Sequence, residues 1–223
     1  MNKTVIKDKF WNIWFKLPKC KKHRKELHDK ARKEINKGLI EDASIVATNC
    51  IGGEISNALG FRFNSPFVNM TMPRNDFVTL CSHFREYMMC EPEIMEGDYP
   101  TVYLGGDGLE KVMIRYIHDT DKNKVYNDFM KRRERINYDK LIFITDDQGL
   151  DDAHLEIFDN IDCFRKVCLT SSEDKERKYR SCHLMPEYRG MPHVGMYQGK
   201  DRSGVHRFEN TWDYVGFLNG GNN

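Results

Sequence analysis

Hydrophobic positions follow two alternating patterns along the chain from about residue 42 onward. Short apolar runs favour strands over residues 44–49, 67–71, 101–104, 112–118, 140–145 and 165–170. Between them, apolar residues at helical spacing favour helices over residues 53–59, 74–89, 121–136 and 151–160. Such alternation is typical of the α/β class. We therefore expect a mostly parallel sheet flanked by helices in Rossmann-like layers.

Two features add detail to this expected sheet. Residues 112–145 read as strand, helix and strand in close succession, which predicts a right-handed crossover over a parallel sheet. Polar residues that favour helix caps precede two of the helices: Asn75 or Asp76 before one, and Asp119, Thr120 and Asp121 before the other.

The two ends of the α/β pattern differ from its centre. Residues 171–204 lose periodicity and become rich in Ser, Gly, Pro, His and charge, which predicts an irregular C-terminal excursion or a lid. Residues 1–41 begin with aromatics and continue as a charged helix from about residue 19 to 38. We therefore expect an N-terminal aromatic and basic helical segment over 1–41 and a single α/β domain over 42–223.

Composition narrows the class of protein. The chain of 223 residues carries 35 Lys and Arg against 34 Asp and Glu, so its net charge of +1 gives no reason to expect nucleic acid as a partner. Seven cysteines without a Cys-x-x-Cys pair favour a reducing compartment over a disulfide framework or a zinc ribbon. The first 20 residues do not resemble a secretory signal, and no window reaches the roughly 18 apolar residues of a membrane span. We expect a soluble, cytoplasmic protein.

Local charge is concentrated near the N-terminus. Residues 10–25 combine Phe and Trp side chains with a run of Lys, His and Arg. This pattern predicts either peripheral contact with the inner face of an anionic membrane or a surface helix whose aromatic residues pack on the domain.

The first strand ends on a group of residues that bear chemistry. Asn49 and Cys50 close the strand, and Gly52 and Gly53 open the next helix. Glycines at this point let backbone N–H groups approach a phosphate or carbonyl oxygen, although neither a dinucleotide fingerprint nor a P-loop is present. Cys50 is either a nucleophile beside a helix terminus or a small buried apolar residue. Ser65 and Asn69 follow in a loop that either holds a sugar hydroxyl or only turns the chain.

Further candidates follow the other strand ends. Asp107 lies in a glycine-rich turn and His118 ends a strand, so either side chain could act as a general base. Arg132 and Arg135 offer guanidinium groups that suit a diphosphate. The acidic run "TDDQGLDD" at 145–152 is compatible with a divalent cation, but helix capping explains part of it, and we predict no metal ligands.

Several stretches together resemble a bacterial family, domain of unknown function 1919, whose members are often labelled exopolysaccharide biosynthesis proteins. The resemblance covers roughly residues 42 to 218 and depends on "SIVATNCIGGEISNALGFRFNSPFVNMTM", "YPTVYLGG", "IRYIHDTDKNKVYNDFMKRRERINYDKLIFI" and "WDYVGFLN". Carried onto this chain, it emphasises the following residues: Asn49, Cys50, Gly52, Gly53, Ser65, Pro66, Asn69, His118, Arg132, Arg135 and Asn137. Members often have Trp where Phe129 stands and His-Tyr where His118-Asp119 stands.

The resemblance implies a role in surface-polysaccharide assembly. We expect a glycosyltransferase that uses a nucleotide-sugar donor and a saccharide acceptor, with the 49–53 turn and the arginines binding the diphosphate and His118 or Asp107 as base. One alternative is a polysaccharide acyltransferase, with Cys50 or Ser65 as nucleophile or His118 as base. The other is a carbohydrate-binding or regulatory module without enzyme activity. The glycosyltransferase hypothesis requires the strand ends near 49 and 118 to share one cleft with the arginine-bearing helix.

Overall fold

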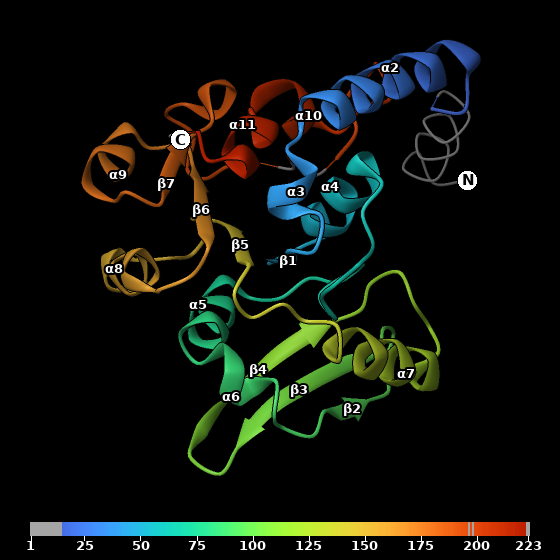
Figure 1. Ribbon diagram of the computed structural model, residues 1–223. Helices are drawn as coiled ribbons and strands as arrows, with labels where there is room; N and C mark the ends of the chain where they lie inside the picture. Colours follow the sequence, from blue (N-terminus) through green and yellow to red (C-terminus); the bar gives the residue numbers. More distant parts are fainter. Residues whose placement is uncertain (1–14, 196, 198, 222–223) are drawn as a thin grey trace, which may run out of the picture.

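Two separate sheets organise the computed structural model, which describes residues 15–195, 197 and 199–221. Within these residues, the larger sheet is parallel, with the strand order β1 (Ser44–Ala47), β5 (Leu141–Asp146), β6 (Arg165–Thr170) and β7 (Cys182–Leu184). The smaller sheet is antiparallel and contains β2 (Glu93–Met95), β3 (Thr101–Gly106) and β4 (Leu109–Arg115). Figure 1 shows the small sheet below the large one. The predicted α/β class with a parallel sheet is confirmed.

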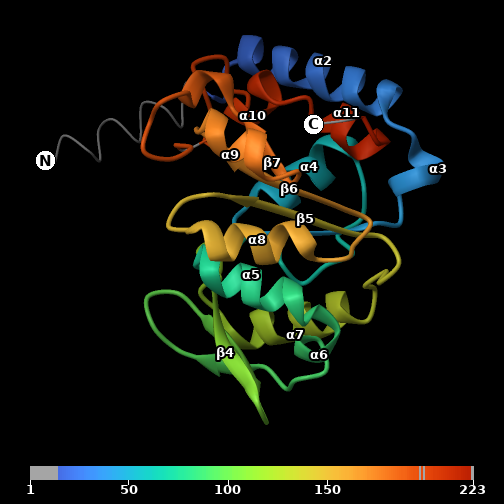
Figure 2. The same cartoon turned by 90° about the vertical axis from the view of Figure 1, so that its left-hand side faces the viewer.

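Helices cover both faces of the parallel sheet because its strands are apolar on both sides. In β5, Ile142 and Ile144 face one core, while Leu141 and Phe143 face the other. The first layer contains α2 (Pro18–Glu34), α3 (Lys37–Ile40), α4 (Ile51–Leu59), α10 (Arg207–Thr211) and α11 (Tyr214–Asn219). The second contains α5 (Arg74–Ser82), α6 (Phe84–Tyr87) and α8 (Asp152–Asn160), with α7 (Lys122–Arg133) and the antiparallel sheet beyond them (Figure 2).

The N-terminal helices share the core of the α/β unit. Ala31, Ile35 and Ile40 are buried in the same apolar cluster as Ile55 of α4. Arg32 of α2 also donates from Nε to the carbonyl oxygen of Ala58, at 2.8 Å. The described part of the N-terminal segment is therefore packed onto the domain.

The predicted crossover over residues 112–145 is wrong. β4 pairs antiparallel with β3, whereas β5 pairs with β1 and β6, so the two strands lie in different sheets. Val112 and Ile114 of β4 are buried while Lys111 and Arg115 are exposed, as expected for an antiparallel sheet with one covered face. Hydrophobic alternation predicts a strand but does not identify its partner.

Some predicted boundaries also change. The 74–89 helix is two helices, because His83 leaves the helical region with φ −130° and ψ 39°. Asn75 and Asp76 do not cap it: Pro73 is the N-cap residue, and the Asp76 carboxylate accepts from the N–H of Met113 instead. Asp121 caps α7 as predicted, accepting from the N–H groups of Asn123 and Lys124.

The irregular segment over 171–204 contains more regular structure than its sequence predicts. It includes α9 (Glu173–Lys178), the edge strand β7 and a short 3-10 helix over Pro186–Tyr188. Each of these elements is too short to produce a clear period in the sequence. The described residues from 189 to 204 contain no helix or strand and include one isolated bridge residue, Lys200.

One loop joins the two sheets. The predicted strand over residues 67–71 is absent as a strand, but Thr71 forms a bridge with Arg115 at the end of β4, with both N–H···O distances at 2.8 Å. The next residue, Met72, donates its N–H to the carbonyl oxygen of Thr48, which follows β1. The loop thus fixes the end of β4 beside the carboxyl end of β1.

Candidate active site

Cys50 and His118 meet where the two sheets join. The Cys50 Sγ atom lies 3.3 Å from His118 Nε2, close enough for the thiol to donate a hydrogen bond to the ring. Cys50 is partly exposed and His118 is exposed, so both side chains are reachable from solvent. A thiol and an imidazole at this distance have the geometry of a nucleophile and its general base.

The fold positions each member of this pair separately. Cys50 follows β1 and is the N-cap residue of α4, where parallel strands end and ligands commonly bind. His118 lies three residues after β4, which is held in place by the Thr71–Arg115 bridge. Neither sheet contains both groups, so the pair depends on the loop between the sheets.

The thiol of Cys50 is protonated in the resting protein. Burial and the nearby carboxylate of Glu54 together raise its pKa to about 11. Glu54 lies one turn further along α4, and its Oε2 atom is 3.1 Å from Nε2 of the buried His206. Burial opposes ionisation of Glu54, but the hydrogen bond and charge interaction with His206, together with Lys200 and Arg24, outweigh it and lower the pKa of Glu54. Cys50 thus has His118 at hydrogen-bond distance and, one helical turn along α4, the carboxylate of Glu54 paired with His206.

Asn49 has a structural task beside this pair. Its Oδ1 atom accepts from the N–H of Ile51 at 3.0 Å, and its Nδ2 donates to the hydroxyl of Tyr197 at 2.7 Å. Tyr197 in turn donates to Asp146 at 3.0 Å, and Asp146 receives two hydrogen bonds from Arg74 at 2.9 and 2.6 Å. This buried network fixes the turn that carries Cys50.

The acidic run after β5 binds protein groups. Asp146 is engaged by Arg74 and Tyr197, whereas Asp147 accepts from Thr170 and Lys175, both at 2.8 Å. The two carboxylates therefore point to different partners, as expected for adjacent residues at a strand end. Among the described residues, no group of three acidic, Cys or His side chains has the arrangement of a metal site.

Gly52 and Gly53 bring α4 close to its neighbours. A Cβ atom on Gly52 would lie 3.2 Å from Ile45 Cγ2 and 3.3 Å from Ala47 Cβ, and one on Gly53 would lie 3.2 Å from Val68 Cγ1. Their absent side chains therefore serve close helix packing, a role that sequence reasoning missed. Their N–H groups still belong to the first turn of α4, where the helix offers them no carbonyl partner.

Ser65 and Asn69 lie in the loop that joins the sheets, but in different surroundings. Ser65 is buried, and its Oγ accepts from the N–H of Phe67 at 3.1 Å, so it stabilises a turn. Asn69 is exposed in the left-handed region at φ 60°, one residue before Met70, whose carbonyl oxygen lies 3.8 Å from the Cys50 sulfur. Asn69 is thus beside the thiol, while Ser65 is inaccessible as a nucleophile.

Asp107 does not join the site. It is an exposed residue at the tip of the β3–β4 hairpin, in the left-handed region at φ 52° between Gly106 and Gly108. β4 runs from this tip toward His118, and its length at about 3.4 Å per residue separates the two side chains by roughly 20 Å. The prediction of Asp107 as a base beside Asn49 and Cys50 is therefore wrong, and the residue serves the turn.

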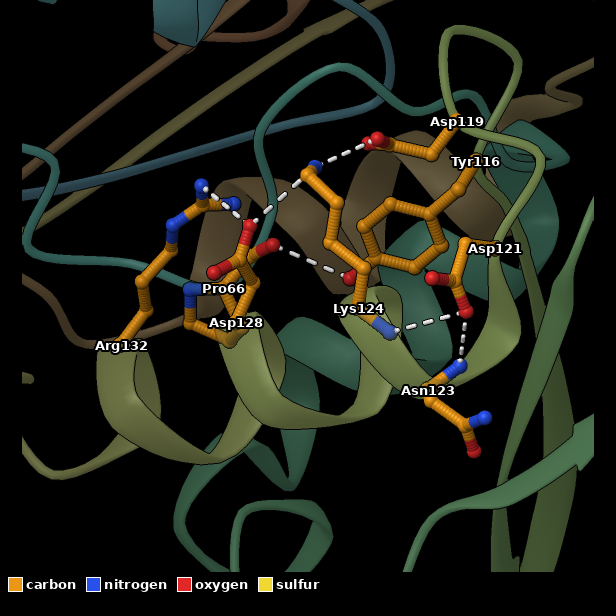
Figure 3. A network of polar contacts seen from close by, with 8 residues as sticks. All are labelled: Pro66, Tyr116, Asp119, Asp121, Asn123, Lys124, Asp128 and Arg132. Carbon is orange, nitrogen blue, oxygen red and sulfur yellow. Dashed lines mark hydrogen bonds and ion pairs between the residues drawn. The ribbon is translucent and has the colours of Figure 1, made fainter.

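Acidic and basic side chains of α7 and of Asp119, which precedes it, form ion pairs with one another close to His118 in the sequence. Lys124 Nζ lies 2.5 Å from Asp119 and 3.4 Å from Asp128, and Arg132 donates to Asp128 at 3.2 Å (Figure 3). Asp119 is consequently paired with Lys124 and does not orient the His118 ring. Arg132 also lies over the Phe63 ring, at 5.8 Å from its centroid.

Arg135 and Asn137 lie at the opposite edge of the parallel sheet from Cys50. The N–H of Asn137 donates to Ser44 Oγ at the start of β1, and its side chain donates to Asp42. Both Arg135 and Asn137 line a cavity at this amino edge. The expected single cleft is therefore wrong: Cys50 and His118 share one edge, while Arg135 and Asn137 occupy the other.

Sequence reasoning missed four residues of the carboxyl edge, namely Arg74, Tyr197, Glu54 and His206. Of these, only Glu54 could have been identified from the sequence, because it follows Cys50 by four residues and therefore lies on the same face of the helix. The other three reach the edge through tertiary folding from α5 or from the segment after residue 189.

The membrane prediction concerns residues 10–25, of which 10–14 lie outside the described residues. In the described part, Lys19, Lys21, Lys22 and Lys25 are exposed on α2, and Leu17 is 40% exposed. None of the helices in the described residues is long and apolar enough to cross a membrane.

Comparison with known proteins gives a family and one relative. The model of the family "Domain of unknown function (DUF1919)" matches residues 20–219. An uncharacterized protein of Haemophilus influenzae is 24% identical over 193 residues, which cover 84% of this chain and 87% of the relative. The match spans the strand ends, the loop between the sheets and α7. The chain therefore belongs to the DUF1919 family.

Proposed function

We propose that the protein is a cysteine-dependent acyltransferase, with Cys50 as nucleophile and His118 as general base. The observation that carries this proposal is the 3.3 Å distance between Cys50 Sγ and His118 Nε2 at the carboxyl edge of the sheet. The donor is an ester or thioester. The acceptor is a saccharide hydroxyl, in keeping with the surface-polysaccharide role and cytoplasmic location expected from the sequence.

The reaction starts from the protonated thiol. His118 Nε2 accepts the thiol proton as Sγ attacks the donor carbonyl carbon, so the raised pKa of Cys50 does not prevent nucleophilic attack. The first-turn N–H groups of Gly52 and Gly53 are available to stabilise the developing oxyanion. Collapse breaks the bond to the leaving group, which takes the proton from His118 and leaves a thioester on Cys50.

The second half of the reaction restores the enzyme. His118 accepts the proton of the acceptor hydroxyl as its oxygen attacks the thioester carbonyl. The carbon–sulfur bond then breaks, and His118 returns its proton to the Cys50 sulfur. The product is an ester of the acceptor, and water in place of the acceptor gives hydrolysis.

Acyl-enzyme formation tests this proposal directly. We expect acetyl-CoA or p-nitrophenyl acetate to add one acetyl group to Cys50, detected by peptide mass spectrometry. Cys50→Ala abolishes the adduct, and His118→Gln slows its formation by roughly 10²–10⁴-fold, the usual contribution of a general base. The partly exposed Cys90, three residues after α6, gives the matched control Cys90→Ala. Equal acylation of wild type and Cys50→Ala contradicts the proposal.

Glycosyl transfer from a nucleotide-sugar is the second candidate, favoured by the exposed His118, which that reaction would also use as base. It does not require a thiol. Cys50→Ser therefore distinguishes the two reactions: it removes most acyl transfer but leaves glycosyl transfer near wild type, while His118→Gln lowers both. The readouts are release of CoA and of nucleoside diphosphate from the respective donors.

A further inference from the structure

A cavity of about 610 Å³ lies at the amino edge of the parallel sheet, away from Cys50. Its walls come from the loop after α4 and from the connection between α7 and β5. Ser44 Oγ joins these walls, because it donates to the carbonyl oxygen of Asn64 at 2.7 Å and accepts from the N–H of Asn137 at 2.8 Å. The cavity is thus part of the fixed structure.

Two guanidinium groups in this cavity lack an acidic group at ion-pair distance among the described residues. The side chains of Arg62 and Arg135 both line it, and neither forms an ion pair or hydrogen bond with a described side chain or carbonyl group. The Arg135 Nε atom is buried without any acceptor. Burial, Arg62 and Arg132 all lower the pKa of Arg135, and the carboxylate of Asp128 offsets only part of this shift.

The acidic residues of the cavity do not relieve this charge. Asp42 accepts from Lys140 at 2.6 Å and from Asn137 at 2.9 Å. Asp139 lies 3.9 Å from Arg85, and Glu134 is exposed. An anionic ligand would supply the missing partner.

We propose that this cavity binds the phosphate group of a small organic phosphate through Arg62 and Arg135. Guanidinium groups donate several hydrogen bonds in a fixed plane and match phosphate oxygens, and the amide of Asn64 adds a further polar group at the wall. The body of the ligand has space beside the phosphate, because a groove of about 1000 Å³ shares Arg85, Tyr138 and Asp139 with the cavity.

The site is separate from the proposed acyl-transfer chemistry. Cys50 and the cavity lie at opposite ends of β1, so a phosphate bound here is not adjacent to the thiol. The same phosphate chemistry occurs in nucleotides, sugar phosphates and lipid headgroups, and the binding experiment distinguishes these sources by its probes.

Isothermal titration at constant ionic strength tests the site with pyrophosphate, uridine diphosphate, glucose 1-phosphate, and vesicles containing phosphatidic acid. We expect at least one soluble probe to bind the wild type. Arg62→Gln and Arg135→Gln should raise its Kd at least about tenfold, because each removes charge-assisted hydrogen bonds. Binding only to vesicles would identify a lipid headgroup and retain the site, provided that the same two variants lose it.

Controls separate this site from general electrostatic attraction and from loss of folding. Lys131→Gln removes one exposed positive charge from the last turn of α7, four residues before Arg135, and should leave Kd unchanged. Cys50→Ser should also leave it unchanged, so failure of the acyltransferase proposal does not affect this test. Arg62 is exposed, and its replacement should keep the wild-type Tm in the absence of ligand. No binding by any probe at millimolar concentration, or an equal loss in Lys131→Gln, would overturn the proposal.

Discussion

Individual residues set the reactivity of Cys50. Its thiol lies at hydrogen-bond distance from His118, while burial and the carboxylate of Glu54 raise its pKa. The carboxylate is close enough to matter because it lies one helical turn away and is partly buried. His206 offsets part of its charge. In the proposed reaction, Cys50 therefore stays protonated until His118 accepts its proton.

Replacement of Glu54 should make this control measurable. We expect Glu54→Gln to lower the pKa of Cys50 below about 11, because the negative charge that opposes the thiolate is removed. The rate of Cys50 alkylation by iodoacetamide, followed by peptide mass spectrometry from pH 7 to 10, should rise at every pH. Glu156→Gln, at an exposed site on α8, is the control and should leave the profile unchanged. An identical profile in Glu54→Gln would contradict this account.

Arg74 should be essential for stability because it neutralises a fully buried carboxylate. The side chain of Asp146 is 0% exposed and pairs with Arg74 at 2.6 Å. Arg74→Met leaves that charge buried without its cation, which we expect to cost about 3–5 kcal/mol in the free energy of unfolding. Urea denaturation measures the loss. Arg177→Met breaks an exposed pair with Glu173 and should cost less than about 1 kcal/mol; similar losses in the two variants would refute the role of burial.

At the scale of elements, the contact between α4 and β1 depends on Gly52. We expect Gly52→Ala to destabilise the protein by about 1–3 kcal/mol through overpacking, since Ala47 Cβ is fixed to its strand and cannot rotate away. At the exposed Gly38 of α3, the nearest atom to an added Cβ is 3.7 Å away. There the same replacement should stabilise by up to about 1 kcal/mol. Thermal denaturation measures the change in stability of both variants. If both replacements stabilise the protein, helix propensity rather than packing decides the effect at Gly52.

Element types were more predictable than their partners. The apolar runs of β1, β5 and β6 identified buried strands because both faces of these strands are covered. The sequence did not reveal that β4 pairs with β3 in a second sheet. The alternation of buried and exposed residues in β4 is typical of an antiparallel strand, but it does not identify the partner strand. It also missed α9 and β7, whose lengths of six and three residues are too short for a recognisable period.

For the candidate site, too, the sequence indicated the individual residues better than their arrangement in space. Cys50 and His118 were recognised because each follows a strand and bears reactive chemistry. Arg135 and Asn137 were assigned to the same cleft, which would require α7 to lead back to the carboxyl edge. In the structure, the polypeptide after α7 enters β5 at its amino end, and this places both residues there. Only the topology of the sheet shows that Arg135 and Asn137 lie at the opposite end of the strands from Cys50 and His118.

For the whole molecule, stability should depend on pH through the edge strand β7. Burial lowers the pKa of His183 from its usual 6.5, and Glu176 only partly opposes this shift. The unfolded chain then binds a proton more readily than the native protein as pH falls below about 6.5. We therefore expect the free energy of unfolding to decrease as pH falls from 7 toward and through the lowered pKa.

Urea denaturation between pH 5 and 7.5 measures this dependence. His183→Gln should reduce the slope, while His23→Gln, at an exposed position on α2, should retain it. A wild-type slope in His183→Gln would contradict the assignment. The comparison uses slopes, so a uniform loss of stability in the variant does not obscure the result.

The junction formed by Thr71 and Arg115 has a consequence for how the protein would fail under stress. Sulfur and imidazole are carried by different sheets, so a small slippage between these bodies separates them while each sheet keeps its own hydrogen bonds. Loss of the proposed acyl transfer should then precede global denaturation, at urea concentrations at which far-ultraviolet circular dichroism is still native. Formation of the proposed acyl-enzyme would then report the alignment of the two sheets more sensitively than the circular dichroism of the backbone.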